Sequence, residues 1–350
     1  MELRKQAIGI DISKDTFTAC LASQPEHGEI QLSPVEVFIN TKSGFNRLLR
    51  WAKPMVDTMV PLVFLMESTG VYYQNLAHHL HGVGKTVHVV LPNKSSHYGK
   101  SLNIKTKTDA TDARVLARFG VERDHRAWEP PSPLLAELRN LTRYYVQLQE
   151  QKTTINNMVH SKQAAHNVQA FILASNKQLV RQIDRQIERC KQQIEKLIAS
   201  DSLLSDRVDQ LASIKGVGRL TVAVILAETR MFEGICNTRQ LASYAGYDVT
   251  ERESGTSVKG KTRISKKGNR YIRNALYFPA MVACRFNPDL KEFYGRVIRN
   301  KPSKMIGQVA VQRKLLLLMY SLYKNGTRYQ EGYNKVAPTP KAEATLDSIA

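Results

Sequence analysis

The sequence predicts an α/β domain with a mixed sheet that is followed by mainly helical segments. Strand-like and helix-like segments alternate through the first third of the chain. From Leu134 onward the apolar residues adopt heptad spacing, and two further helical segments follow a polar loop near residue 260. The 350 residues are 42% hydrophobic, so the chain can bury cores in two or three units.

The N-terminal third alternates apolar runs of strand length with amphipathic segments of helix length. Strands are predicted at AIGIDIS (7–13), TFTACLA (16–22), EVFIN (36–40), PLVFLME (61–67) and TVHVVLP (86–92). Helices are predicted at TKSGFNRLLRWAK (41–53), which Thr41 is expected to cap, VYYQNLAHHLHGVG (71–84) and DATDARVLARFG (109–120). The first two strands are expected to pair. This alternation predicts a layered α/β domain.

Two heptad series follow, each of which predicts a long helix. The first consists of Leu134, Leu138, Leu141, Tyr145, Leu148, Ile155 and Val159. The second consists of Val180, Ile183, Ile187, Cys190, Ile194 and Leu197, and after Asp201 it resumes at Leu204, Val208 and Leu211. Such helices can fold back on each other within one chain or pair between subunits, and the pattern alone leaves both arrangements open.

The C-terminal part predicts short helices around one polar loop. IKGVGRLTVAVILAET (214–229) predicts a glycine turn leading into a helix, and TRQLASYAG (238–246) predicts a short helix ended by glycine. Residues 269–286 and 303–326 predict two more helices on the far side of the loop. The residues after Gly326 predict a flexible tail.

The charge predicts a polyanionic partner. The 51 Lys and Arg residues exceed the 31 acidic ones by 20, and residues 251–330 alone carry eighteen basic against four acidic residues. The chain has no apolar run long enough to suggest a membrane span. Its four cysteines are far apart and form no CxxC pair, which argues against a zinc ribbon or a secreted disulfide framework. We therefore expect a cytoplasmic protein that binds nucleic acid.

Four carboxylates fall where α/β folds build sites, at strand ends and at a helix start. Asp11 ends one predicted strand, Glu67 ends another, and Asp109 and Asp112 share one face of a predicted helix. Clustered carboxylates of this kind hold the Mg²⁺ or Mn²⁺ ions of phosphodiester chemistry. Each acid singly has an ordinary explanation, with Asp109 as a helix cap and Glu67 as a surface acid. Together, on a basic chain, they favour a metal site.

Ser254 opens a strongly basic stretch, ESGTSVKGKTRISKKGNRYIR (253–273). A Ser-Gly step is ordinary turn chemistry, so the residues alone leave open whether Ser254 is a turn residue or a nucleophile. Every histidine lies at or before His166, which excludes a local Ser-His pair. Phosphate contacts are predicted at Lys259, Lys261, Arg263, Lys266, Lys267, Arg270 and Arg273, and further nucleic-acid contacts at Lys105, Lys107 and Arg114.

GIDISKD, MESTGVYY, KTDATDAR and ESGTSVKGKTRISKKGNRYIRNALYFPAMVA occur in an order and spacing that resembles one family. It is the DEDD transposase and recombinase family of bacterial insertion sequences, which includes Piv-type DNA invertases and some members guided by a bridge RNA. The resemblance runs from about Ile8 to Gly326. It implies that Asp11, Glu67, Asp109 and Asp112 form the metal-binding tetrad and that Ser254 is the nucleophile.

The resemblance also implies an organisation and a set of partners. Residues 1–128 would form a RuvC-like, RNase H-type domain, 129–210 a helical coiled-coil segment, 211–326 the transposase domain with the serine, and 327–350 a tail. The expected partners are DNA, a structured guide RNA and further copies of the chain in a dimer or tetramer. Two other functions stay open, a RuvC-like nuclease or junction resolvase that uses water, and an invertase without guide RNA.

Overall fold

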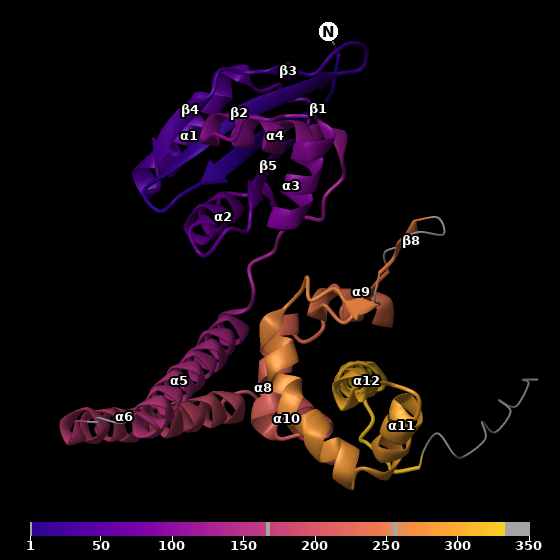
Figure 1. Ribbon diagram of the computed structural model, residues 1–350. Coiled ribbons are helices and arrows are strands. Elements are labelled where there is room, and N and C mark those ends of the chain that lie inside the picture. Colours follow the sequence, from indigo (N-terminus) through magenta and orange to yellow (C-terminus); the bar gives the residue numbers. More distant parts are fainter. Residues whose placement is uncertain (1, 166–168, 252, 255–257, 261, 333–350) are drawn as a thin grey trace, which may run out of the picture. The chain divides into compact units, whose positions relative to one another are not determined.

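The computed structural model describes residues 2–165, 169–251, 253–254, 258–260 and 262–332. The chain divides into two compact units, Met1–Pro130 and Pro131–Ala350. In Figure 1 the first unit is drawn in indigo to magenta and the second in magenta to yellow. The predictions for Lys261 and for residues 333–350 concern positions outside the described residues.

The first unit is built on one six-stranded mixed sheet. Its strands are β1 (Leu3–Ile12), β2 (Thr16–Pro25), β3 (Gln31–Leu32), β4 (Glu36–Ile39), β5 (Leu62–Glu67) and β6 (Thr86–Val90). They are ordered β3-β2-β1-β5-β6, with β4 also paired to β2. The pairs β1–β2, β2–β3 and β2–β4 are antiparallel, whereas β1–β5 and β5–β6 are parallel. The mixed sheet expected from the sequence is therefore confirmed.

Helices cover both faces of this sheet. On one face, α1 (Lys42–Ala52) and α2 (Tyr73–Gly82) bury Leu48 and Leu76 against Ile8 and Ile10 of β1. The other face is covered by α3 (Pro92–Ser101) and α4 (Asp109–Glu122). Successive residues of a strand point to opposite faces, so the continuous apolar run of β1 supplies both layers. The result is a three-layer α/β domain.

The predicted strands and helices of this unit are confirmed, and the structure adds the two-residue strand β3 and helix α3. Helix α3 was not expected, because its sequence PNKSSHYGKS has no apolar period and buries only Ser95 and Tyr98. Pro92 at the first helical position fixes a helical φ angle and begins the helix. Thr41 stands at the N-cap of α1, although its side chain accepts no backbone N–H.

The two heptad helices form a hairpin within one chain. α5 (Pro133–Gln163) and α6 (Ala170–Ala199) pack along each other in the second unit, and α7 (Ser202–Ala212) follows after Asp201, which caps it. The heptad residues Ile183, Ile187, Cys190 and Ile194 of α6 are buried in this packing. Of the two arrangements that the sequence left open, the structure has the intrachain one.

The remaining helices pack around α8 (Arg219–Thr229), which is buried over its last eight residues. The others are α9 (Thr238–Ala245), α10 (Arg270–Phe286), α11 (Pro288–Ile298) and α12 (Lys304–Asn325). Residues 327–332, at the start of the predicted tail, contact this bundle through Tyr329, whose hydroxyl donates to Asp289 Oδ2 at 2.8 Å. The helical class predicted for this part of the chain is confirmed. No helix within the described ranges is both long and apolar enough to span a membrane.

Candidate active site and nucleic-acid interface

Asp11 and Glu67 lie side by side at the same edge of the sheet. β1 and β5 run parallel, and their last paired residues are Ile10 and Met66. Asp11 and Glu67 come next on each strand and, because side chains alternate, both point to the face opposite the Ile10–Met66 core, the face that α4 covers. Adjacent strands are about 4.8 Å apart, so the register alone makes neighbours of two acids 56 positions apart in the chain.

Gly9 lets α4 approach β1 closely enough to bring the other two acids to this edge. A Cβ atom on Gly9 would lie 2.0 Å from Ala117 N and 2.4 Å from Ala113 O of α4. Any larger residue would push the helix off the strand. Asp109 and Asp112 stand in the first turn of α4, next to the end of β1 that carries Asp11.

Thr108, not Asp109, caps α4. Its hydroxyl oxygen accepts the N–H of Thr111 at 3.2 Å, and Asp109 is the first helical residue. The capping explanation of Asp109 that the sequence allowed is therefore wrong. Since the cap is already satisfied, the exposed Asp109 carboxylate is not engaged in helix termination.

Two hydroxyl groups hold the Glu67 carboxylate. Thr69 Oγ1 donates to Oε1 and Ser95 Oγ donates to Oε2, each at 2.6 Å. Ser95 lies on the unpredicted helix α3 and is buried. Sequence reasoning missed both residues, although the MEST motif, which contains Thr69 two residues after Glu67, could have indicated the first.

The electrostatics show that the four acids form one cluster. Burial, together with the like charges of Asp112, Asp109 and Glu67, raises the pKa of Asp11 to about 6. Burial also raises the pKa of Asp112, against the opposing charge of Lys107. Carboxylates repel one another in this way only when they share a site, and a cation would relieve the repulsion.

The donor set fits a hard divalent cation. Carboxylate and hydroxyl oxygens are the ligands that Mg²⁺ and Mn²⁺ prefer. Across the described ranges, however, no three acidic, histidine or cysteine side chains converge closely enough to hold an ion as they stand. The carboxylates of this cluster therefore have the right chemistry, and binding would require them to draw together.

We predict that Asp11→Asn stabilises the metal-free first unit at pH 7.5 by about 1 kcal/mol, after allowance for solvent screening. The folded pKa, about 6, lies above the ordinary 3.8, so the acid favours folding when it is protonated and this contribution is lost as the pH rises through 6. Urea denaturation in EDTA at pH 7.5 and pH 4 measures the effect. The gain should shrink toward zero at pH 4, and equal stability at pH 7.5 would contradict the clustering.

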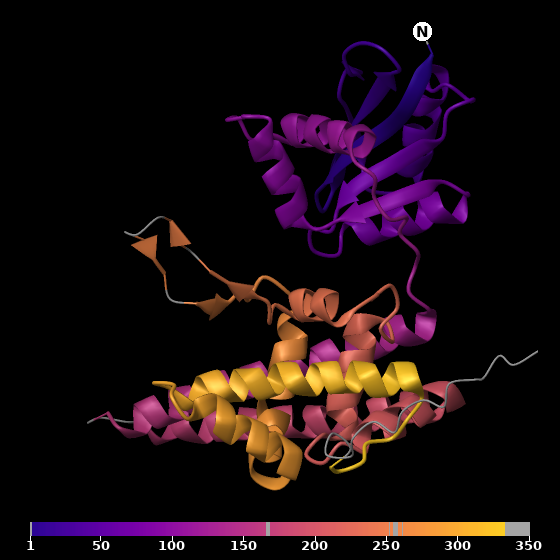
Figure 2. The ribbon, with the colours of Figure 1, turned by 90° about the vertical axis from the view of Figure 1, so that its right-hand side faces the viewer.

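Ser254 lies on an arm that extends from the helices of the second unit. We call residues 247–268 the serine arm. Its base is the antiparallel pair of β7 (Val249–Thr250) and β10 (Arg263–Ile264), and farther out β8 (Glu253–Ser254) pairs with β9 (Val258–Lys259). Figure 2 shows these short strands extending outward from the region of α9. Ser254 pairs with Val258 near the end of the arm, not in the plain polar loop that the sequence predicted.

The two ends of the serine arm cross at a pair of glycines. Gly246 has a φ of +73°, and a Cβ atom on Gly268 would lie 2.4 Å from Gly246 N. Lys266 N donates to Gly246 O at 3.1 Å, and Asn269 N donates to Tyr244 O at 2.8 Å. A side chain on either glycine would separate the two strands of the arm at its base.

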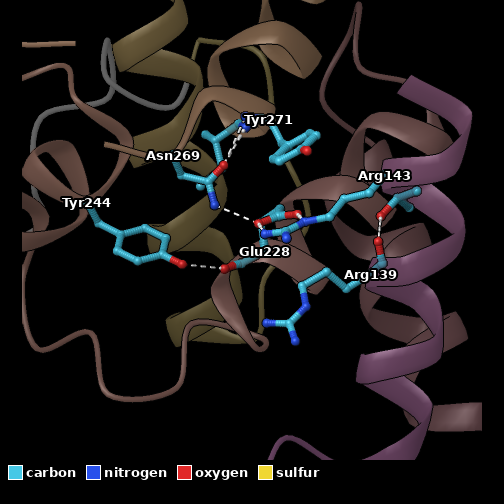
Figure 3. Close-up of polar contacts among 8 residues, drawn as sticks. Arg139, Arg143, Glu228, Tyr244, Asn269 and Tyr271 are labelled. Carbon is cyan, nitrogen blue, oxygen red and sulfur yellow. Dashed lines mark hydrogen bonds and ion pairs between the residues drawn. The ribbon is translucent and has the colours of Figure 1, made fainter. Parts of the chain in front are cut away.

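Glu228 anchors this base to the helical core, as Figure 3 shows. Its side chain, only 1% exposed, accepts Arg143 Nε at 2.6 Å and Arg143 Nη2 at 2.8 Å. It also accepts Asn269 Nδ2 at 2.6 Å, while Tyr244 donates its hydroxyl to the Glu228 carbonyl oxygen at 2.7 Å. Asn269 caps α10 through its Oδ1 atom. Glu228 thus joins α5, α8 and the residues on both sides of the arm, through its carboxylate to Arg143 and Asn269 and through its backbone carbonyl to Tyr244. Sequence reasoning missed this residue.

Two sequence families match the two halves of this arrangement. One, described as a DEDD transposase of the IS110 type, matches residues 8–162, which contain the four carboxylates. The other, described as the transposase IS116/IS110/IS902 family, matches residues 208–295, which contain Ser254. The chain belongs to the DEDD transposase family.

Individual relatives of this DEDD transposase cover nearly its whole length. It is 28% identical over 331 residues to the pilin gene-inverting protein of Moraxella bovis, a match that covers 94% of this chain and 99% of the relative. The protein of the same name from Moraxella lacunata matches to the same extent. The RuvC structure from Thermus thermophilus is similar with 12% identity and a TM-score of 0.27, over 35% of this chain and 99% of RuvC. At the general level, the predicted DNA recombination enzyme is confirmed.

Most basic residues predicted for DNA contact are exposed in this transposase. Lys105 and Lys107 precede α4, and Arg114 lies on it. Lys259 lies in β9 of the serine arm. Exposed residues on the second half of the arm or at the start of α10 are Arg263, Lys266, Lys267 and Arg270. They remain predicted contacts.

Arg273 differs from the rest because its guanidinium group is used inside the protein. Nη1 donates to Ala245 O at 2.7 Å and to Asn269 O at 3.3 Å, across the base of the serine arm. Arg270 lies over the Tyr271 ring at 5.1 Å, where Arg143 also lies at 4.6 Å. Arg273 is therefore placed to hold the arm, while Arg270 remains on the surface.

We predict that Glu228→Ala lowers the free energy of unfolding of the second unit by about 3 kcal/mol, because it leaves Asn269 and Arg143 without their buried acceptor. Arg143 is 39% exposed and can turn to water, which keeps the loss below that of a fully buried pair. Thermal or urea denaturation measures the change. The control is Glu233→Ala, an exposed acid of the same unit that should shift stability by under about 0.5 kcal/mol. Equal effects would contradict the anchoring role.

Proposed function

We propose that this transposase cuts and rejoins DNA through a covalent phosphoserine intermediate on Ser254, with Asp11, Glu67, Asp109 and Asp112 as its metal site. The observation that supports it most is the cluster of four carboxylates at one sheet edge, in which the pKa of Asp11 is raised to about 6. Structural acids rarely gather without a cation partner. The position of Ser254 on a basic arm adds the nucleophile.

The proposed reaction exchanges one phosphate ester for another. The Ser254 oxygen attacks the phosphorus of a DNA phosphodiester, and the bond from phosphorus to one deoxyribose oxygen breaks. The proton of the serine hydroxyl passes, directly or through water, to that leaving oxygen. The products are a phosphoserine ester and a free DNA hydroxyl. Attack by a hydroxyl of another DNA end reverses the step and releases the serine, so no ATP is consumed.

In this reaction the carboxylates, the basic residues and the two hydroxyl groups would have separate roles. Asp11, Glu67, Asp109 and Asp112 would hold Mg²⁺ or Mn²⁺, which when bound supplies electrostatic stabilisation of the charge on the phosphate and the leaving oxygen. The exposed Arg263, Lys266 and Lys267 would hold the phosphate as its charge grows. Thr69 and Ser95 keep the Glu67 carboxylate oriented.

The proposed partners are DNA, a structured guide RNA and further copies of the chain. The surplus of fourteen positive charges over residues 251–330 supports binding to a nucleic acid, with a steep dependence on salt. Joining two DNA ends requires two cleavage sites held together, which supports a dimer or tetramer. The α5–α6 seam is occupied within the chain, so such an assembly would use other surfaces.

A second candidate is DNA inversion without a guide RNA. It is favoured by the pilin gene-inverting proteins of Moraxella, which match 94% of this chain at 28% identity. The chemistry at Ser254 would be the same in both cases. The two candidates differ in whether RNA or protein selects the DNA.

The test incubates the purified protein with DNA carrying candidate element ends and Mg²⁺, followed by denaturation. We expect a protein–DNA adduct that survives denaturation and disappears in EDTA. Cleavage without an adduct would instead indicate a nuclease that uses water. Running the reaction after ribonuclease treatment, with and without RNA transcribed from the element, separates the guided mode from the RNA-free mode.

A further inference from the structure

A groove of about 650 Å³ lies beneath the base of the serine arm. One wall is formed by β7 and β10, through Val249, Arg263 and Ile264. The opposite wall is the first half of α12, which Figure 2 shows running beside the arm. The volume is in the range of small-molecule and nucleotide sites. The groove and Ser254 therefore belong to the same substructure.

Apolar residues of the two walls form one exposed patch, which we call the floor of the groove. Val249, Met305 and Ile306 are 50%, 48% and 42% exposed, and the half-buried Val309 and Leu317 continue the patch inward. Single exposed apolar residues are ordinary, but contiguous ones that line a hollow mark a binding surface. The flat, apolar faces of a nucleobase can lie against such a floor once the base has left the stack.

The charged side chains that line the groove are all cationic. They are Arg263, Lys301, Arg313 and Lys314. Among the described residues, no acidic side chain forms an ion pair with Arg263, Lys301 or Arg313. A neutral apolar partner would leave these charges uncompensated, whereas a phosphate-bearing one would neutralise them. Charge complementarity thus favours a nucleotide over an apolar protein segment.

The groove lies within reach of the serine along a single DNA strand. Thr250 pairs with Arg263 at the groove, and Ser254 is only four positions along the chain from Thr250. Four residues span at most about 14 Å. One strand of B-DNA advances about 3.4 Å per nucleotide, so this span corresponds to about four nucleotides. A strand with its phosphate at Ser254 can also reach the groove.

We propose that this groove binds an unpaired nucleotide of the DNA strand on which Ser254 acts. Its base lies on the floor of Val249, Met305 and Ile306, and its flanking phosphates contact Arg263, Lys301 and Arg313. A paired base cannot present its face to the floor because its neighbours in the duplex cover it. That the bound nucleotide belongs to the strand attacked by Ser254 rests on the function proposed for Ser254. Binding of an unpaired nucleotide in the groove does not depend on that function.

The test compares Ile306→Asp with Leu203→Asp in the full-length protein. Both residues are exposed, apolar and in the first turn of a helix, where an aspartate is tolerated. Only Ile306 lines the groove. Fluorescence anisotropy measures binding of a dT12 single strand and of a 12-base-pair duplex. We expect Ile306→Asp to weaken dT12 binding about tenfold and duplex binding less than twofold, as for loss of one base contact. Leu203→Asp should change neither.

Several outcomes would overturn the proposal. They are wild-type affinity of Ile306→Asp for dT12, an equal loss for the duplex, tighter binding of a U12 strand than of dT12, or a change in oligomeric state that accompanies a retained dT12 affinity. A second measurement tests where the strand lies. In Arg313→Ala, the slope of log affinity for dT12 against log salt concentration should decrease by the equivalent of about one phosphate contact. Ser254→Ala should bind dT12 as the wild type does. Failure of the serine chemistry and failure of the groove are thus separate results.

Discussion

Replacement of Ser254 by alanine is expected to lower the yield of the denaturation-resistant adduct with DNA by about a thousandfold or more. The variant should still bind DNA and Mg²⁺, because the lost hydroxyl is proposed to act only as the nucleophile. Gel electrophoresis after denaturation measures the adduct, and filter binding measures affinity for DNA.

The neighbouring hydroxyls provide matched controls for this variant. Thr256→Ala and Ser257→Ala remove hydroxyl groups two and three positions along the chain, and they should retain the adduct at least in part. Peptide mass mapping of the wild-type adduct should identify Ser254. An adduct that persists in Ser254→Ala, or that maps to another residue, would return Ser254 to the role of a turn residue.

The second large effect is expected at the carboxylate cluster. Asp112→Asn should lower DNA strand cleavage by about a thousandfold, because a neutral amide cannot replace the proposed charged metal ligand, whose charge interacts with those of Asp11, Asp109 and Glu67. Asp109→Asn should act in the same direction. Isothermal calorimetry with Mn²⁺ measures the loss of metal binding, and a gel-based assay with labelled DNA measures cleavage.

Asp124→Asn is the matched control in the same unit. The Asp124 side chain is exposed and pairs with Lys5, away from the four acids, so the change should leave cleavage within about twofold. Both Asn variants at the cluster should remain folded, because they remove repulsion instead of packing. Undiminished cleavage by Asp112→Asn or Asp109→Asn would remove that residue from the proposed site.

The sequence predicts the sheet and its acidic edge well because both are local patterns. Apolar runs of strand length define β1, β5 and β6, and the acids stand at the strand ends where a chain-order argument already places them. Helix α3 could not be predicted in the same way, because its sequence has no apolar periodicity. The contact of the buried Ser95 with Glu67 is not indicated by any local pattern. A polar helix that buries only Ser95 and Tyr98 is visible only in the fold.

The long-range contacts mark the limit of prediction in the second unit. Heptad spacing predicts that α5 and α6 have an apolar seam, but it cannot tell whether the partner is the same chain, because the seam is the same in both cases. Glu228 is harder still. It sits in an apolar helix, 85 residues from Arg143 and 41 from Asn269, and no local pattern joins them. Buried ion pairs become recognisable only when three-dimensional neighbours are known.

The crossing of the serine arm at Gly246 and Gly268 has a consequence for how these enzymes diversify. The hydrogen bonds from Glu228, Arg273 and Asn269 end at this crossing, and Tyr247 and Ile264 just beyond it pack against the helical core. Among the described residues farther out, β8 pairs only with β9 of the arm itself. Changes of length or sequence between residues 251 and 262 therefore leave the helical core untouched. The outer part of the arm can therefore differ in length and sequence between related chains, and with it the proposed contacts to DNA, while the core stays the same.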